Sequence, residues 1–186
     1  SQTVYRRSVI ERTGLYEVTI TNFMDWWMLY KCSCISDMGV INEKLCRYRI
    51  WPGSETSYMV KHMYMPIQGY LNRVTMLRQA ELDHDRRMLE RADAAVEKQA
   101  DLTLKLSTEV IRDGDYDMGR RYLELARAFS LNIVKSSLYQ AMDAYLKNNT
   151  GQTAGQTIDE YLGSLGLCGR RNQSYDPPEH YILYDG

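Results

Sequence analysis

The sequence predicts a mainly α-helical protein built on a long antiparallel helical hairpin, with a small irregular or β N-terminal part and an extended C-terminal arm. Three observations predict this class. Proline, which breaks helix interiors, is absent from Ile67 to Asp176. Apolar residues in this region recur at helical spacing. Gly114, within the stretch RDGD, suits the left-handed residue of a tight turn between two helices.

The first long helix is expected over residues 67–112. A heptad-like stripe marks its buried side, with Leu82, Leu89, Val96, Thr103 and Val110 recurring every seven residues. The opposite side carries charge pairs four residues apart, such as Asp83 with Arg87. An apolar stripe opposite a charged side predicts a helix that packs through one face and exposes the other to solvent.

The second long helix is expected over residues 116–147. Two of its faces are apolar, one containing Tyr122 and Phe129 and the other Leu138 and Met142. A helix with two apolar faces is usually central in its domain. Because the connection between the two helices is short, they should form an antiparallel hairpin.

Residues 1–55 read as an N-terminal mixed segment. Alternating patterns over Val4–Ile10 and Leu15–Thr21 suggest two paired strands. A helix over Phe23–Met38 is expected next, capped by Asn22 and closed by Gly39. Residues 44–51 alternate as well, and fit either a strand or a helix.

Residues 56–147 form the predicted helical hairpin core, which opens with a helix over Ser57–Met65 that is bent or separated at Pro66. Residues 148–186 are expected to hold a polar linker, a short helix and an extended arm. Thr157 and Glu160 fit a capping box at the start of the short helix, and Gly166 fits its end.

Charge and hydropathy exclude several classes of protein. Lys plus Arg number 23 and Asp plus Glu number 24, so no global charge drives the chain toward nucleic acid or an anionic membrane. No apolar run approaches the length of a membrane span, and the N-terminus lacks the apolar core of a signal peptide. The four cysteines are interpreted as reduced thiols, which favours a reducing intracellular compartment or a virion over secretion.

The stretch Gln79–Arg91 contains two halves of known metal motifs. Glu81 and His84 have the spacing of a carboxylate di-iron helix, and His84 with Asp85 resembles the pair of an HD-type phosphohydrolase. A di-iron site would need a second such motif, and the chain has only three histidines. We therefore expect no metal or cofactor here: His84 lies two residues beyond the seam and should sit on a charged outer face. The HD-type reading, with His62 as a further ligand, stays an alternative.

Residues Asp113–Phe129 resemble the start of the second helix of a tetratricopeptide repeat. The Gly114-Asp-Tyr116 turn, Tyr122 and Ala126 carry this resemblance. It covers one helix of one unit, and the pattern does not recur at a period near 34 residues. The resemblance implies a helical hairpin and, as an alternative, a repeat-like peptide groove.

Two segments mix basic and aromatic residues, as nucleic-acid-binding surfaces do. They are Arg47–Trp51 and Gly169–Tyr175. Such residues can stack on bases and neutralise phosphates. A nucleic-acid-binding helical module is therefore another alternative.

The favoured function is that of a non-enzymatic structural subunit of a large multi-protein assembly. No phosphate-binding glycine loop or nucleophile motif is present, and 15 Tyr against 2 Phe suits protein interfaces. The predicted partner-binding residues form a cluster in the C-terminal arm: Tyr175, Tyr181, Ile182, Leu183 and Tyr184. A virion component, such as a head–tail connector or internal core protein, is the first choice and an accessory subunit of an organellar complex the second. Either role implies a homo-oligomer or a multi-subunit complex.

Overall fold

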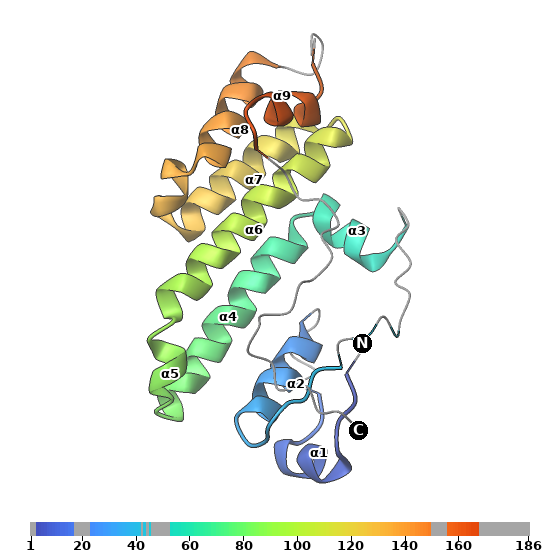
Figure 1. Ribbon diagram of the computed structural model, residues 1–186, viewed down its shortest axis with the longest axis vertical. Coiled ribbons are helices and arrows are strands. Elements are labelled where there is room, and N and C mark those ends of the chain that lie inside the picture. The colour runs from blue at the N-terminus through green and yellow to red at the C-terminus, as the bar shows by residue number, and fades with distance from the viewer. Residues whose placement is uncertain are drawn as a thin grey trace. The chain divides into compact units, whose positions relative to one another are not determined.

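The computed structural model describes residues 3–16, 23–41, 43, 45, 53–149 and 156–167. All regular structure among these residues is helical, so the predicted mainly α class is confirmed (Figure 1). The chain divides into two units. The described residues up to 45 belong to the first unit and those from 53 to 167 to the second.

The first unit contains α1 (Arg7–Thr13) and α2 (Met24–Ser33). The strand predicted over Val4–Ile10 is wrong, because the residues from Arg7 on lie in α1, where Arg7 and Glu11 form an i,i+4 ion pair of 2.9 Å. The Lys31 ammonium of α2 donates to the carbonyl oxygens of Thr13 and Leu15, at 3.1 and 3.0 Å. These bonds place a positive charge at the carbonyl end of α1, where it is favourable.

Helix α2 ends at Ser33, five residues before the predicted end at Met38. Serine hydroxyls bond to the last carbonyl groups: Ser33 donates to Tyr30 at 2.7 Å and Ser36 donates to Cys32 at 2.8 Å. Such side-chain bonds compete with continued helix. The predicted cap Asn22, the strand residues 17–21 and most of residues 44–51 lie outside the described residues.

The second unit begins with α3 (Glu55–Lys61) and α4 (Tyr64–Leu82). Ser54 caps α3, its hydroxyl accepting a 3.2 Å hydrogen bond from the Ser57 N–H. The break between α3 and α4 falls at Met63, whose φ of 59° is left-handed. It does not fall at Pro66, which lies in the first turn of α4, where a missing N–H leaves no helical bond unmade.

The single helix predicted over residues 67–112 is wrong, because the helix is interrupted between Asp83 and Arg91. Three helices replace it: α4, α5 (Arg86–Leu89) and α6 (Ala92–Arg112). His84 adopts a left-handed φ of 55°, and the Asp85 carboxylate accepts from the Met88 N–H at 3.2 Å as the cap of α5. As a result Leu82, predicted to be on the buried seam, is 68 % exposed.

Helices α6 and α7 (Tyr116–Phe129) lie side by side, joined by the short turn that contains Gly114 (Figure 1). Gly114 has the expected left-handed φ of 86°, and the Asp115 carboxylate caps α7 by accepting from the Met118 N–H at 2.9 Å. The two helices approach closely at Gly119, where an added Cβ would lie 2.6 Å from Ile111 Cγ1.

The second long helix, predicted over residues 116–147, is also divided. After α7 the chain forms a 3₁₀ turn, η1 (Leu131–Lys135), and then α8 (Ser137–Asn148). Ser130 is extended, and the Ser136 hydroxyl starts α8 by accepting from the Tyr139 N–H at 3.2 Å. Phe129, at the end of α7, is half-buried and stacks on Tyr70 of α4 with ring centroids 4.4 Å apart.

Helix α9 (Ile158–Ser164) closes the main core against α6 and α8. Its predicted capping box is confirmed, and Gly166 follows it with a left-handed φ of 67°. The core combines buried residues from α6, α7, η1, α8 and α9, among them Leu104, Ile111, Leu123, Met142, Tyr145, Leu146 and Leu162. The predicted C-terminal arm lies outside the described residues.

Candidate functional site

A half-open pocket of about 300 Å³ lies between the α6–α7 turn and the start of α9. Its lining residues come from four segments: Ile111, Arg112, Gly114, Tyr116, Tyr145, Gln156, Thr157, Ile158 and Asp159. None of these side chains is a histidine, cysteine or lysine, which are common nucleophiles and bases. Whether the pocket is a site depends on what its charged and hydroxyl groups already bind.

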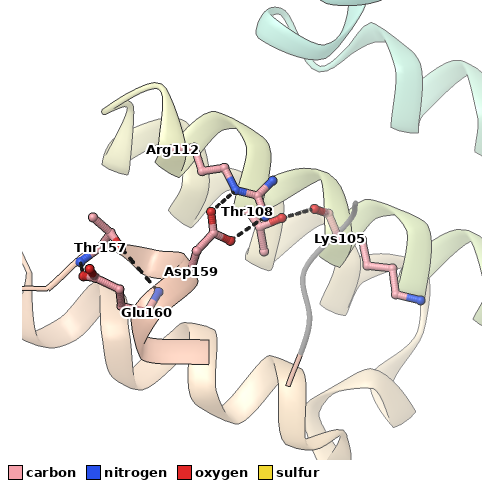
Figure 2. A network of polar contacts seen from close by, with 6 residues as sticks. All are labelled: Lys105, Thr108, Arg112, Thr157, Asp159 and Glu160. Carbon is pink, nitrogen blue, oxygen red and sulfur yellow. Dashed lines mark hydrogen bonds and ion pairs between the residues drawn. The ribbon is translucent and has the colours of Figure 1, made fainter. Parts of the chain in front are cut away.

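The charged groups of the pocket bind one another (Figure 2). Arg112 donates from Nε to Asp159 Oδ2 at 2.7 Å and from a terminal nitrogen to Oδ1 at 2.6 Å, a bidentate pair between α6 and α9. Hydrogen bonding to Asp159 raises the pKa of Arg112. Beside this pair, Thr157 and Glu160 complete the cap of α9. These hydrogen bonds link α9 to the end of α6, and the charges of Arg112 and Asp159 compensate each other.

Tyr145, beside the pocket, is a hydrogen-bond donor rather than a base. The buried Tyr145 hydroxyl donates to the Gln156 carbonyl oxygen at 2.9 Å. Burial, together with Tyr116, raises the pKa of Tyr145 to about 12, so it stays protonated at neutral pH. Its ring lies 5.3 Å from that of Tyr161 on α9. These contacts connect α9 to α6 and α8 around the pocket.

The stretch with the two half-motifs, in which we expected no metal, forms the turn between α4 and α5. Glu81 is exposed near the end of α4, His84 is exposed in the left-handed turn, and Asp85 caps α5. His62, the upstream ligand of the HD-type alternative, lies against the Tyr58 ring at 4.1 Å between centroids. Across the described part of the chain, no three His, Cys, Asp or Glu side chains gather closely enough to hold a metal ion.

A second surface feature is the outward face of α4. Four of its apolar side chains, spaced three, four and three residues apart, are each 40–55 % exposed: Tyr64, Ile67, Leu71 and Val74. We call these four residues the α4 stripe. The surrounding sequence, MYMPIQGYLNRVTML, contains one charged residue, Arg73. Arg73 is half-buried and donates to the Gly69 carbonyl oxygen at 3.0 Å, so no charge interrupts the stripe.

Aromatic side chains extend the α4 stripe at its N-terminal end. Tyr58 is 54 % exposed on α3, and its ring centroid lies 6.0 Å from that of Tyr64. The exposed His62 ring lies against both, at 4.1 Å from Tyr58 and 6.1 Å from Tyr64. Exposed tyrosines beside aliphatic side chains are typical of protein–protein interfaces.

The opposite face of α4 packs against α6 inside the second unit. Gln99 of α6 donates to the Pro66 carbonyl oxygen at 2.9 Å, and its amide lies against Gly69. Asn72 is only 3 % exposed, yet neither polar atom of its amide has a hydrogen-bond partner among the described residues. With one face buried and the other apolar and exposed, α4 has the pattern of a helix covered on both sides.

The residues predicted to bind partners, Tyr175, Tyr181, Ile182, Leu183 and Tyr184, lie outside the described residues. The sequence-based reasoning missed the α4 stripe. Its signal was the three–four–three apolar spacing in a segment almost without charge. The heptad register that we assigned from Leu82 runs back to Thr75 and Gln68, one residue away from the stripe.

Comparisons with known proteins add no relative: no family model, no curated protein and no solved structure matches this chain. Within the described residues, no helix has both the length and the hydropathy needed to cross a membrane.

Proposed function

We propose that this chain is a structural subunit of a larger multi-protein assembly and that the α4 stripe is a surface through which it joins its neighbours. The observation that carries this proposal is the uncharged, apolar outward face of α4. A helix facing water normally carries charged residues there, as α6 and α7 do. A contiguous apolar surface rimmed by polar residues is typical of an interaction site.

The size of the α4 stripe favours a contact of modest strength. Fully burying one large apolar side chain contributes about 1.5–3 kcal/mol, so four half-exposed ones contribute on the order of 3–6 kcal/mol. Association itself costs about 4–15 kcal/mol in lost freedom of motion. The four side chains of one chain do not offset this cost alone, so the side chains that the partner buries, the adjoining Tyr58 or a second contact must add to them. This is the situation of a subunit held by several neighbours at once.

The C-terminal cluster of Tyr175, Tyr181, Ile182, Leu183 and Tyr184 is proposed as that second contact. Virion and organellar assemblies are two settings for such a subunit. The motif behind the phosphohydrolase alternative forms the turn that Asp85 caps. The basic and aromatic segments behind the nucleic-acid alternative lie outside the described residues. The α4 stripe is thus what favours a protein partner.

Sedimentation of the tagged full chain from its native cells tests the proposal. The 21.7 kDa chain should migrate in a particle several times its own mass. Leu71→Asp places a charge in the centre of the α4 stripe and should release the chain from that particle, while its helical circular dichroism stays unchanged.

The matched control is Leu131→Asp. Leu131 is an equally apolar residue, 76 % exposed, and lies on η1, outside the α4 stripe. This variant should remain in the particle. Sedimentation of the unmodified chain at its monomer mass would contradict the proposed function, and so would release by Leu131→Asp but not by Leu71→Asp.

A further inference from the structure

We propose that the partner of the α4 stripe is the α4 stripe of a second copy of this chain, packed antiparallel about a two-fold axis. This inference rests on the proposed function and names one of the neighbours. It follows from the spacing of the stripe, from its lack of charge and from the placement of the charges beyond its end.

The spacing makes the stripe complementary to itself. Its three–four–three pattern is that of coiled-coil seam positions, which pack as knobs into holes. In an antiparallel pair centred between Ile67 and Leu71, Ile67 faces Leu71 of the second copy. Tyr64 then faces Val74, so each of the outer layers pairs one large side chain with one small one. A two-fold contact requires such reciprocity, because one surface must serve both sides.

The absence of charge also suits a second copy. In a two-fold contact each residue near the axis lies close to its own equivalent, so a charged residue there would meet a like charge. The outward residues of α4 from Tyr64 to Thr75 are all uncharged. A self-contact along this face therefore carries no like-charge repulsion.

The charges beyond the stripe favour the antiparallel orientation. Arg78 is the next outward residue on the same line, and Glu81 follows it. In the antiparallel pair the two Arg78 residues lie at opposite ends, 18 helical residues or about 27 Å apart along the axis. That separation exceeds the screening length of about 8 Å at physiological ionic strength. In a parallel pair the two Arg78 side chains would lie side by side.

Sedimentation equilibrium of the purified full chain tests the self-contact. Its mass should approach twice 21.7 kDa as the concentration rises. Leu71→Asp should keep the helical circular dichroism and return the mass to that of the monomer, whereas Leu131→Asp should remain dimeric. Because the contact is apolar, raising the salt from 0.1 to 1 M should leave the dimer intact or tighten it.

Disulfide trapping tests the orientation. Ile67→Cys and Leu71→Cys are introduced separately into a chain whose Cys34, Cys46 and Cys168 are replaced by serine. In the antiparallel pair a mixture of the two variants should give mainly the mixed 67–71 disulfide. Each variant alone should give several-fold less, because disulfide formation requires Cα atoms within about 7 Å. A parallel pair would instead trap each variant with itself.

The outcomes separate this inference from the proposed function. A monomer mass at every concentration overturns the inference, and self-trapped 67–67 and 71–71 products overturn its antiparallel form. If the purified chain is monomeric while Leu71→Asp still releases it from the native particle, the stripe binds a different protein. In that case the proposed function stands, and the inference that the partner is a second copy of this chain is wrong. If neither experiment responds to Leu71→Asp, both fail.

Discussion

Helices α4 and α7 differ most in what they present to solvent. The outward residues of α7 are charged, with Asp117, Arg121, Glu124 and Arg127 exposed. Those of α4 are apolar from Tyr64 to Val74. Both helices bury their other face in the second unit, so burial alone does not distinguish them. The charged exposed face of α7 suits contact with water, whereas the uncharged exposed face of α4 is the basis of the contact proposed above.

The inward faces differ as well. On α7, the Tyr122 side chain is fully buried and its hydroxyl donates to the Val60 carbonyl oxygen at 2.6 Å. Burial raises the pKa of Tyr122, so this donor stays protonated. On α4, the buried Asn72 amide has no partner among the described residues. The packing of α7 is closely specified, whereas that of α4 leaves a polar group uncompensated.

The largest expected effect is on the α7 side. Tyr122→Ala should lower the free energy of unfolding by about 3–5 kcal/mol, because it removes a buried ring from a close-packed cluster. Tyr122→Phe keeps the ring and removes only the hydroxyl's hydrogen bond, because the Val60 carbonyl oxygen still accepts from the Met63 N–H at 3.2 Å. This loss should cost about 0.5–1.5 kcal/mol. Urea unfolding measures both. Equal losses would show that the hydrogen bond, rather than the packing, fixes this contact.

A pair of glycines should sharpen the comparison. Gly119→Ala on α7 would press a methyl group against the buried Ile111 side chain, at 2.6 and 2.9 Å, and should cost about 1–3 kcal/mol. Gly69→Ala on α4 meets only the amide end of the Gln99 side chain, at 3.0 Å, which can shift by rotation about its side-chain bonds. The gain of about 0.5–1 kcal/mol from replacing a helical glycine should offset that contact. Thermal unfolding of both variants should give a loss for the first and a change near zero for the second.

Replacing Asn72 tests whether its buried amide is truly unsatisfied. Asn72→Ala removes two uncompensated polar atoms from the α4–α6 packing and should raise the free energy of unfolding by about 1 kcal/mol. The exposed Asn132, whose amide donates to Glu97 at 2.9 Å, serves as a control. Asn132→Ala should change stability by less than about 0.5 kcal/mol. A loss of stability in the Asn72 variant would indicate a bound water or a partner group at this amide.

The smallest effect concerns the cap of α9. Hydrogen bonds from the Thr157 backbone and hydroxyl lower the pKa of Glu160 below its ordinary value near 4.5. The carboxylate therefore stabilises the fold fully above that value, and the contribution is lost as the pH falls through the lowered folded pKa. Glu160→Gln keeps an oxygen that can accept from Thr157 but does not titrate. The melting temperature of this variant should fall less steeply than that of the parent below pH 4.5. If the melting temperatures of both proteins fall equally with pH, Glu160 does not stabilise the cap as a carboxylate.

Local signals in the sequence predicted the helical class and several helix ends. Gly114, Gly166 and the Thr157–Glu160 box act through backbone conformation and short-range hydrogen bonds, which can be read within a few residues. The break at His84 was not predicted. The aspartates and arginines around His84 suit a charged helix face as well as a capped turn. The residue with the left-handed backbone is His84 rather than a glycine, so the sequence carries no turn signal there.

The α4 stripe was missed for a different reason. A three–four–three apolar pattern normally faces the core, so sequence alone does not show that these residues are exposed. The structure shows that Pro66, Gly69, Asn72, Met76 and Ala80 occupy the buried side instead. Small and polar residues on that inward face make it weakly apolar, and the pattern of hydrophobic residues therefore indicated the wrong side.

The left-handed residues at the two ends of α4 have a consequence for local unfolding. Met63 and His84 are the non-glycine residues with positive φ in the described part of the chain. Each holds an unfavourable backbone conformation that is relieved when the helix detaches. We therefore expect the amides of α4 to exchange with deuterium together, as one cooperative unit with limits at Met63 and His84. Their protection should be lower than that of α6, and it should rise with protein concentration if the proposed self-contact covers the stripe.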